Sequence, residues 1–234
     1  MTQPRRRAAP RAPDADRTQR DELVAAARRL DALGMNRGST GNASVRASAG
    51  GFWITPTGMS AAELDADRLV RIDEEGVAHG DWEPSSEWHF HRAIYRVRAD
   101  LRAVLHTHSV HATALACLRR ELPAFHYMVA VAGGASVPCT PYHLFGTEAL
   151  SDAVALAFGD RNACLLANHG LVAAGHGMPH ALKVLQEVEA LCEIYLKALA
   201  VGEPALLTAG QMAEVAERFR HYGRKRSSRA DIGR

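Results

Sequence analysis

Apolar residues recur with helical spacing in several stretches of the chain. Between residues 18 and 34 they lie three or four positions apart, and Thr18 is followed three positions later by Asp21, an arrangement similar to a capping box. We therefore expect a helix over this stretch, ended by Gly34. The same spacing predicts further helices over residues 111–118, with Ala112, Leu115 and Leu118 on one face, 147–158, 179–201 and 210–221.

Short apolar runs between turn residues predict the strands of a sheet. Turns such as Pro56-Thr57-Gly58 and Glu74-Glu75-Gly76 follow the first of these runs. Short strands with such hairpin-like turns favour a mainly antiparallel sheet over repeated βαβ units. Together with the helices, the pattern predicts an α/β fold. The predicted strands cover residues 52–55, 69–72, 101–105, 164–167 and 171–174.

Length and charge divide the chain into one domain and two arms. The chain has 234 residues and is 47% hydrophobic, which suits a single domain with a substantial core. Residues 1–20 carry six Arg against two Asp, and residues 217–234 carry seven basic against two acidic residues, so the body is at −7 although the whole chain is at +2. We expect a disordered basic arm over 1–17, the domain over 18–224 and a basic tail over 225–234.

Several classes of function are disfavoured by what the sequence lacks. The folded part has no basic stripe interleaved with aromatic residues, so we expect no nucleic-acid partner. No run approaches the roughly 18 apolar residues of a membrane span. The four cysteines form no C-x-x-C pair, which predicts free thiols and a cytoplasmic protein, although the Arg-rich start is also compatible with a transit peptide. Phosphate-loop motifs for dinucleotides and nucleoside triphosphates are absent.

Histidines at predicted strand ends point to a metal site. His106 and His108 follow the run over 101–105, and alternate side chains of an extended segment point the same way, so both can reach one ion. A surface or core coincidence is the alternative explanation for such a pair. His169, in Asn168-His169-Gly170, is a third histidine delivered by a strand end into a glycine turn.

Small polar residues point to an anion site nearby. Ser85 and Ser86 precede a helical run, where they can serve as an N-cap or bind phosphate with the free N–H groups of the first turn. Glu87 belongs to the same helix end, although acidic residues there are common. The turn before Asn42 either holds an anion or is an ordinary link between a helix and a strand.

Seven ordered motifs resemble the class II aldolase/adducin family over residues of about 18 to 224. They are G-N-A-S-V-R (41–46), I-T-P-T-G (54–58), S-S-E-W-H-F-H (85–91), H-T-H (106–108), H-Y-M-V-A-V-A-G-G (126–134), N-H-G (168–170) and F-R-H-Y-G (219–223). His89 and Asn168 depart from the family pattern, and these departures bear on which substrate is bound.

The resemblance implies a three-layer α/β/α fold around a nine-stranded, mainly antiparallel sheet. It also implies a homotetramer whose active sites are shared between subunits, and the apolar, glycine-rich stretch over 125–134 suits such an interface. The implied activity is cleavage of a ketose 1-phosphate, such as L-fuculose 1-phosphate or a 5-deoxy- or 5-methylthioribulose 1-phosphate, into dihydroxyacetone phosphate and an aldehyde. Epimerases, decarboxylases, dehydratases and the non-enzymatic adducin heads share the family; three histidines and Glu87 argue against the last.

The resemblance further assigns roles by motif. Zn²⁺, with Mn²⁺ or Co²⁺ as substitutes, would be held by His106, His108 and His169. Glu87 would be a fourth ligand that leaves the metal and acts as acid and base. Tyr127 and Tyr222 would be the proton donor and a substrate-side group, and this pair favours the aldolase. The implied phosphate-binding residues are Asn42, Thr57, Gly58, Ser85 and Ser86.

Overall fold

An eight-stranded sheet forms the centre of the computed structural model, which describes residues 16–221. The strands run in the order β4-β3-β2-β1-β5-β8-β7-β6, and only the β6–β7 pair is parallel. The predicted mainly antiparallel sheet is confirmed, with eight strands among the described residues where the resemblance implied nine. They are β1 (Asn42–Arg46), β2 (Phe52–Ile54), β3 (Val70–Ile72), β4 (Ala78–His79), β5 (Ala103–Thr107), β6 (Cys139–Thr140), β7 (Ala163–Leu166) and β8 (Gly170–Gly175).

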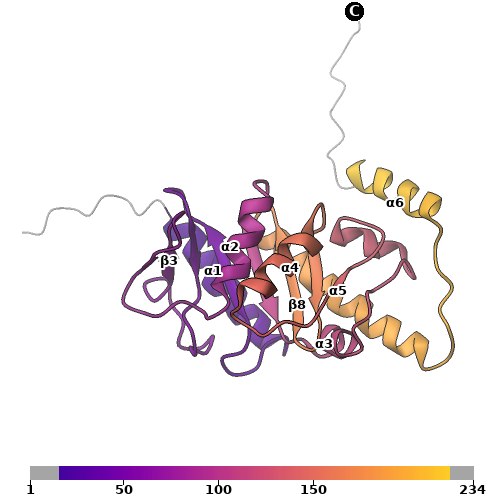
Figure 1. Cartoon of the computed structure of the whole chain (residues 1–234), viewed down its shortest axis with the longest axis horizontal. Helices are drawn as coiled ribbons and strands as arrows, with labels where there is room; N and C mark the ends of the chain where they lie inside the picture. Colours follow the sequence, from indigo (N-terminus) through magenta and orange to yellow (C-terminus); the bar gives the residue numbers. More distant parts are fainter. Residues whose placement is uncertain (1–15, 222–234) are drawn as a thin grey trace, which may run out of the picture.

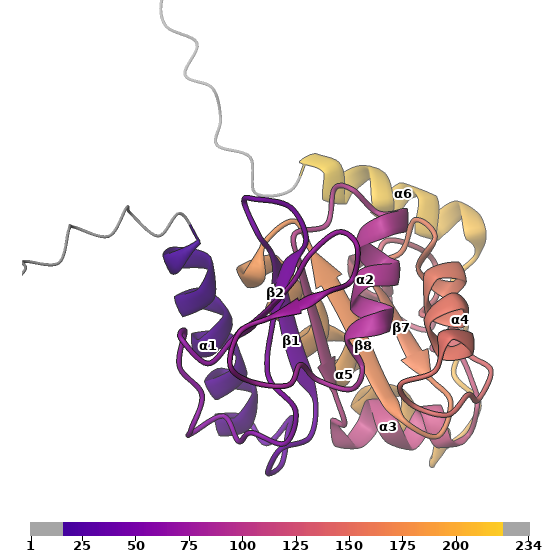
Figure 2. The same cartoon turned by 60° about the vertical axis from the view of Figure 1, so that its left-hand side comes forward.

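Helices cover both faces of this sheet and make three layers. α2 (Trp88–Val97) and α4 (Glu148–Phe158) pack side by side on one face (Figures 1 and 2). The other face is covered by α1 (Arg17–Ala32), α3 (Val110–Cys117) and α5 (Met178–Leu199). A 3₁₀ helix, η1 (Tyr127–Ala132), and the last helix, α6 (Ala209–His221), contact each other beside this layer.

Alternation along the central strands fills two separate cores. In β5, Ala103 and Leu105 pack with α1, α3 and α5, whereas Val104 faces α2 and α4. All three side chains are fully buried. A strand covered on both faces is apolar at every position, which explains why the sequence there is a continuous apolar run.

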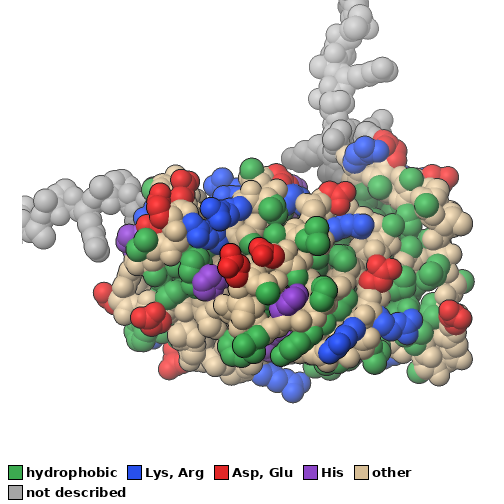
Figure 3. Space-filling view, in the orientation of Figure 1, with side chains coloured by type: hydrophobic (Ala, Val, Ile, Leu, Met, Phe, Trp, Pro, Cys, Tyr) green, Lys and Arg blue, Asp and Glu red, His purple; other side chains and the backbone are tan. Residues whose placement is uncertain are grey.

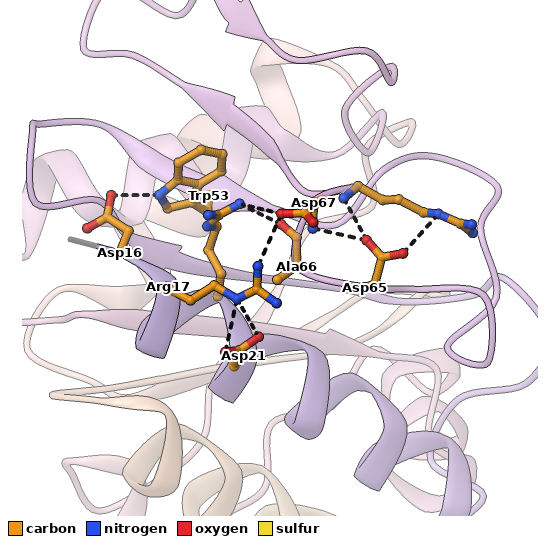
Figure 4. A network of polar contacts seen from close by, with 9 residues as sticks. Asp16, Arg17, Asp21, Trp53, Asp65, Ala66 and Asp67 are labelled. Carbon is orange, nitrogen blue, oxygen red and sulfur yellow. Dashed lines mark hydrogen bonds and ion pairs between the residues drawn. The ribbon is translucent and has the colours of Figure 1, made fainter. Parts of the chain in front are cut away.

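Tertiary contacts fix the start of α1, and the capping box predicted at Thr18 is wrong. The N-cap is Asp16, and its side chain does not cap the helix but accepts a hydrogen bond from Trp53 Nε1 at 2.8 Å (Figure 4). It also accepts one from the Ser48 backbone N–H at 2.9 Å. Burial opposes ionisation of Asp16, but these hydrogen bonds outweigh it and lower the pKa of the carboxyl. The predicted arm therefore ends before Asp16, and its residues 1–15, like the predicted tail over 225–234, lie outside the described residues.

Two other helices differ from expectation at their ends. The N-cap of α2 is Glu87, not Ser85 or Ser86, and no side-chain hydrogen bond caps that helix. α3 ends at Cys117, and Leu118, which follows it, is 55% exposed while Ala116 is buried. The four cysteines are free thiols, as predicted. Within residues 16–221, none of the helices is both long and apolar enough to span a bilayer.

Candidate active site

Three histidines converge where β5 and β7 end and β8 begins. His106 is the fourth residue of β5, His108 lies just beyond that strand, and His169 lies in the turn between β7 and β8. One ring nitrogen of each lies within 4.8 Å of the other two, and the Nε2 atoms of His106 and His108 are 3.1 Å apart. The structure thus brings the pair His106 and His108 together with His169 of the turn between β7 and β8.

Hydrogen bonding and burial prepare the triad to bind a cation. His106 Nδ1 lies 3.0 Å from the Leu171 carbonyl oxygen, which can only accept, so Nδ1 carries the hydrogen and Nε2 keeps its lone pair. Burial, aided by the neighbouring His108, lowers the pKa of His106 to about 3. Burial and the nearby His106 likewise lower the pKa of His169 to about 4. Both rings are therefore neutral near pH 7, the form that ligates metals.

Glycine after His169 allows this close approach. A Cβ at Gly170 would lie 2.4 Å from the Thr107 carbonyl oxygen, 3.1 Å from His108 and 3.2 Å from His106. Any larger residue would push the β5 end away from the turn that carries His169. The N-H-G motif thus has a packing reason for its glycine.

Glu87 reaches the triad from the N-terminus of α2. Its Oε2 lies 3.3 Å from His106 Nε2 and accepts a 2.9 Å hydrogen bond from Asn42 Nδ2. Its Oε1 lies 3.2 Å from His169 Nε2, is buried and makes no hydrogen bond to any residue that the structure describes. A buried carboxylate oxygen without a donor is costly, and a cation between it and the imidazoles would remove that cost.

The donor set fits a divalent metal ion. Three neutral imidazole nitrogens with one carboxylate match the ligand types of zinc sites, and imidazole also suits other transition metals. The triad and the Glu87 oxygen beside it indicate a metal site more strongly than the H-x-H pattern does alone.

A cavity of about 540 Å³ opens beside the triad. His108, His169 and Glu87 line it, whereas His106 is fully buried behind them. Phosphate roles were assigned by resemblance to Asn42, Thr57, Gly58, Ser85 and Ser86, and all five residues line the same cavity. The side chain of Asn42 already contacts Glu87 on one side and His91 on the other.

Part of the cavity wall was not predicted from the sequence, and the roles assigned to two tyrosines stay predictions. Tyr142, His143 and Phe145, from the loop between β6 and α4, line the cavity, and loop residues of this kind carry no periodic signal. Ser39 and Thr40, from the turn before Asn42 that was a candidate anion site, also line it. Tyr127 is 49% exposed on η1 and is not among the lining residues of its own chain. Tyr222 lies outside the described residues. His89 also lies outside this cavity, and Asn168 lines it.

A second carboxylate fixes the segment that follows His108. Glu189 on α5 accepts hydrogen bonds from the backbone N–H groups of His111 and Ala112, at 2.9 and 2.8 Å, and from Ser109 Oγ at 2.7 Å. His111 Nδ1 lies 2.9 Å from the same carboxylate. Glu189 therefore satisfies the N-terminus of α3 in place of a local cap.

Replacing Glu189 by Ala is expected to lower the free energy of unfolding by about 3 kcal/mol, because several donors at a helix start lose one charged acceptor. Urea unfolding of the protein measures it. Glu193→Ala, one turn further along α5 in an exposed pair with Lys197, is the matched control and should leave the free energy of unfolding nearly unchanged. Equal losses for both variants would show that the Glu189 contacts add nothing.

Comparison with known proteins places this site in context. Residues 21–196 match the family model described as Class II Aldolase and Adducin N-terminal domain. A 5-methylthioribulose-1-phosphate/5-deoxyribulose-1-phosphate aldolase of Rhodospirillum rubrum is 48% identical over 204 residues, covering 87% of this chain and 92% of the relative. An L-fuculose phosphate aldolase of Escherichia coli is 47% identical over 192 residues, covering 82% and 89%. The solved structure of an L-fuculose 1-phosphate aldolase superposes with a TM-score of 0.84 at 38% identity, covering 87% of this chain and 96% of that one.

Proposed function

Because the chain belongs to the class II aldolase and adducin family and is an aldolase of the class II sugar-phosphate type, we propose that it cleaves a ketose 1-phosphate between C3 and C4. The products are dihydroxyacetone phosphate and an aldehyde. The observation that carries this proposal is the arrangement of Glu87 beside three clustered histidines, in a cavity that also contains uncharged hydrogen-bond donors.

Cleavage requires two proton transfers. A base removes the C4 hydroxyl proton as the C3–C4 bond breaks, and an acid then protonates the enediolate carbon of the dihydroxyacetone phosphate half. Glu87 is suited to the second transfer, because one of its oxygens is pinned by Asn42 while the other has no hydrogen-bond donor. The phenols of Tyr127 and Tyr222 are proposed for the aldehyde side.

His106, His108 and His169, with Glu87 as the fourth ligand, would hold a divalent metal ion, and we propose zinc. When bound, such an ion supplies Lewis-acid stabilisation of the negative charge that develops on the enediolate. Glu87 then serves both as a metal ligand and in proton transfer. Its two carboxylate oxygens allow both roles, because only Oε2 is held by Asn42.

The phosphate group is proposed to bind to Thr57, Gly58, Ser85, Ser86 and Asn42, which line the same cavity as Glu87. Uncharged hydroxyl and backbone donors would hold the phosphate group, which is remote from the bond that breaks, and thereby orient the substrate. Ser85 Oγ accepts a 3.3 Å hydrogen bond from the Glu87 backbone N–H, so its own hydrogen remains to donate. The same clamp thus adjoins Glu87.

Replacing Thr57 or Ser86 by Ala is expected to raise KM for a ketose 1-phosphate by roughly tenfold or more, since a hydrogen bond to a charged group contributes about 1.5 to 3 kcal/mol. Steady-state kinetics with and without the phosphate group on the substrate measure it. Thr40→Ala, which changes another hydroxyl of the cavity wall, is the comparison. If the parent enzyme turns over the unphosphorylated ketose equally well, the phosphate assignment is wrong.

The aldehyde half is proposed to end in an apolar group. Tyr142 and Phe145 line the cavity with exposed fractions of 52% and 60%, so apolar surface is available for a methyl or methylthio end. The experiment is a coupled assay for dihydroxyacetone phosphate over L-fuculose 1-phosphate, 5-deoxyribulose 1-phosphate and 5-methylthioribulose 1-phosphate. Release from at least one of them supports the proposed function, and release from none contradicts it.

We further propose a homotetramer in which Tyr127 acts in the site of a neighbouring subunit. Tyr127 is half-exposed and lies outside the cavity of its own chain, so it is free to meet another copy. η1, which carries it, has its Val129 and Ala132 buried in the domain core, so the tyrosine projects from a fixed support.

Mixed tetramers of Glu87→Gln and Tyr127→Phe chains are expected to regain activity. Each site would draw Glu87 from one chain and Tyr127 from its neighbour, so random mixing restores an intact pair at about one interface in four. Co-expression with two affinity tags, followed by the coupled assay, measures it. The control is the same mixing experiment with Tyr142→Phe in place of Tyr127→Phe, because Tyr142 lines the cavity of its own chain. Mixed tetramers no more active than the average of their parents would indicate a site built within one chain.

A further inference from the structure

Behind Glu87 lies an unbroken row of buried polar side chains between β1 and α2. Asn42 and Ser44 come from one face of β1, two residues apart, and His91 and Tyr95 come from one face of α2, four residues apart. Ser44 and His91 are fully buried, and Asn42 and Tyr95 are 8% and 6% exposed. Glu87 precedes His91 by four residues on the same helix face, so strand and helix periodicities bring all five groups together.

The contacts in this row are short and consecutive. Tyr95 Oη lies 2.9 Å from Ser44 Oγ, and Ser44 Oγ lies 2.7 Å from His91 Nδ1. His91 Nε2 lies 2.6 Å from Asn42 Oδ1. Asn42 Nδ2 then lies 2.9 Å from Glu87 Oε2, which completes the row.

The chemistry of the carboxylate sets the direction of every bond in the row. An ionised Glu87 only accepts, so Asn42 must present its amide nitrogen to Oε2 and its amide oxygen to His91. That oxygen also only accepts, so His91 Nε2 carries a hydrogen. Burial lowers the pKa of His91 well below its ordinary value and keeps the ring neutral, so Nδ1 accepts from Ser44. Ser44 in turn accepts from the Tyr95 hydroxyl.

The opposite orientation of the Asn42 amide is unfavourable at both ends. It would turn the amide oxygen toward the Glu87 carboxylate and the amide N–H groups toward the Nε2 hydrogen of His91. Unpaired buried polar groups are costly, so the His91 tautomer selects the amide orientation that holds Glu87.

We propose that His91 is a positioning residue for the reaction, which acts through the Asn42 amide to hold Glu87 Oε2 and thereby keeps Oε1 directed at His169. The proposal rests on the proposed function in that Glu87 is the group to be held. Ser44 and Tyr95 extend the same row, in which Ser44 donates to His91 Nδ1 and accepts from Tyr95.

Neutron diffraction from a deuterated crystal of the metal-loaded parent protein tests the row without any assay. The expected result is a deuteron on His91 Nε2, none on Nδ1, and the Asn42 ND₂ group facing Glu87. A deuteron on Nδ1 alone, or the reversed amide, would overturn the proposal.

Kinetics of two variants test the consequence. His91→Phe removes the donor to Asn42 and is expected to lower kcat about 10- to 100-fold at nearly unchanged KM, whereas His91→Gln, whose amide N–H can replace that donor, should recover most of kcat. Thr140→Val alters a buried side chain whose hydroxyl has no partner and should leave kcat unchanged. Parent-like kcat in a folded His91→Phe protein would overturn the proposal.

The two claims can fail separately. If the parent enzyme cleaves no ketose 1-phosphate, the proposed function fails, and the deuteron positions alone decide whether the row is directed as described. If His91→Phe does not fold, His91→Gln and the diffraction result decide. A Gln variant as slow as expected for Phe would count against the row, because it keeps the donor.

Discussion

Glu87→Gln is expected to lower kcat by roughly 10²-fold or more, because glutamine keeps the size of the side chain but cannot take a proton. The variant can still accept the Asn42 hydrogen bond through its amide oxygen, so α2 and the cavity should keep their shape. The metal ion should remain bound through the three histidines. Steady-state kinetics with metal analysis of the same sample measures both.

Glu193→Gln is the matched control for this change. It makes the same substitution on the exposed surface of α5 and should leave kcat unaltered. Turnover close to the parent value in Glu87→Gln would show that the carboxylate takes no part in proton transfer.

Replacing His106, His108 or His169 by Ala is expected to release about one metal ion per subunit and to abolish cleavage, since three protein ligands are the usual set of a catalytic metal site. Elemental analysis of the purified variants measures the metal directly. Circular dichroism shows whether each variant is folded, which matters most for the fully buried His106. His180→Ala, on the distant start of α5, should keep its metal.

Full metal content in all three variants would contradict the assignment of the triad. Loss of metal with full activity would contradict the role of the ion in the reaction. The expected result is loss of both in each variant, because no other group of His, Cys, Asp and Glu among the described residues has ligand spacing.

Local periodicity made part of this site predictable. His106 lies on β5 and His108 just beyond its end, and the alternation of side chains in this extended segment places both rings on one side. His169 was predictable as the end of a second apolar run before glycine. Its distance from the pair was not, because the packing at Gly170 that brings β5 and the turn together involves residues more than sixty positions apart.

Polar partners distant in sequence explain most of the differences. Thr18 has the spacing of a cap, but Asp16 begins α1 because Trp53 and Ser48, from another part of the chain, hold its carboxylate. Ser85 and Ser86 were predicted to cap α2, but Glu87 takes that position because it faces the histidines. Helix and capping propensities take account only of the residues near a helix end. The ends of α1 and α2 are determined by tertiary contacts instead.

The row behind Glu87 had a sequence signal that was not used. Glu87, His91 and Tyr95 recur every fourth residue, and Asn42 and Ser44 alternate on a strand. Either pattern alone is typical of an ordinary buried face. The two patterns are joined only by the packing of β1 against α2, which neither pattern predicts.

The two basic arms and the homotetramer stay predictions. Acidic and basic side chains are interspersed over the face shown in Figure 3, and both basic ends of the chain lie largely outside the described residues. The tetramer rests on the exposed position of Tyr127 and on the resemblance, and the mixed-chain experiment tests it.

Hydrogen exchange into dihydroxyacetone phosphate tests the central claim most directly, because it needs no knowledge of the aldehyde half. By microscopic reversibility, the zinc-loaded enzyme in D₂O without aldehyde should exchange one of the two hydroxymethyl protons of this compound for deuterium. Proton NMR measures the loss of the corresponding signal. Glu87→Gln and chelator-treated enzyme should exchange far more slowly. Retention of both protons by folded, zinc-loaded parent enzyme would contradict a Glu87-centred aldolase site.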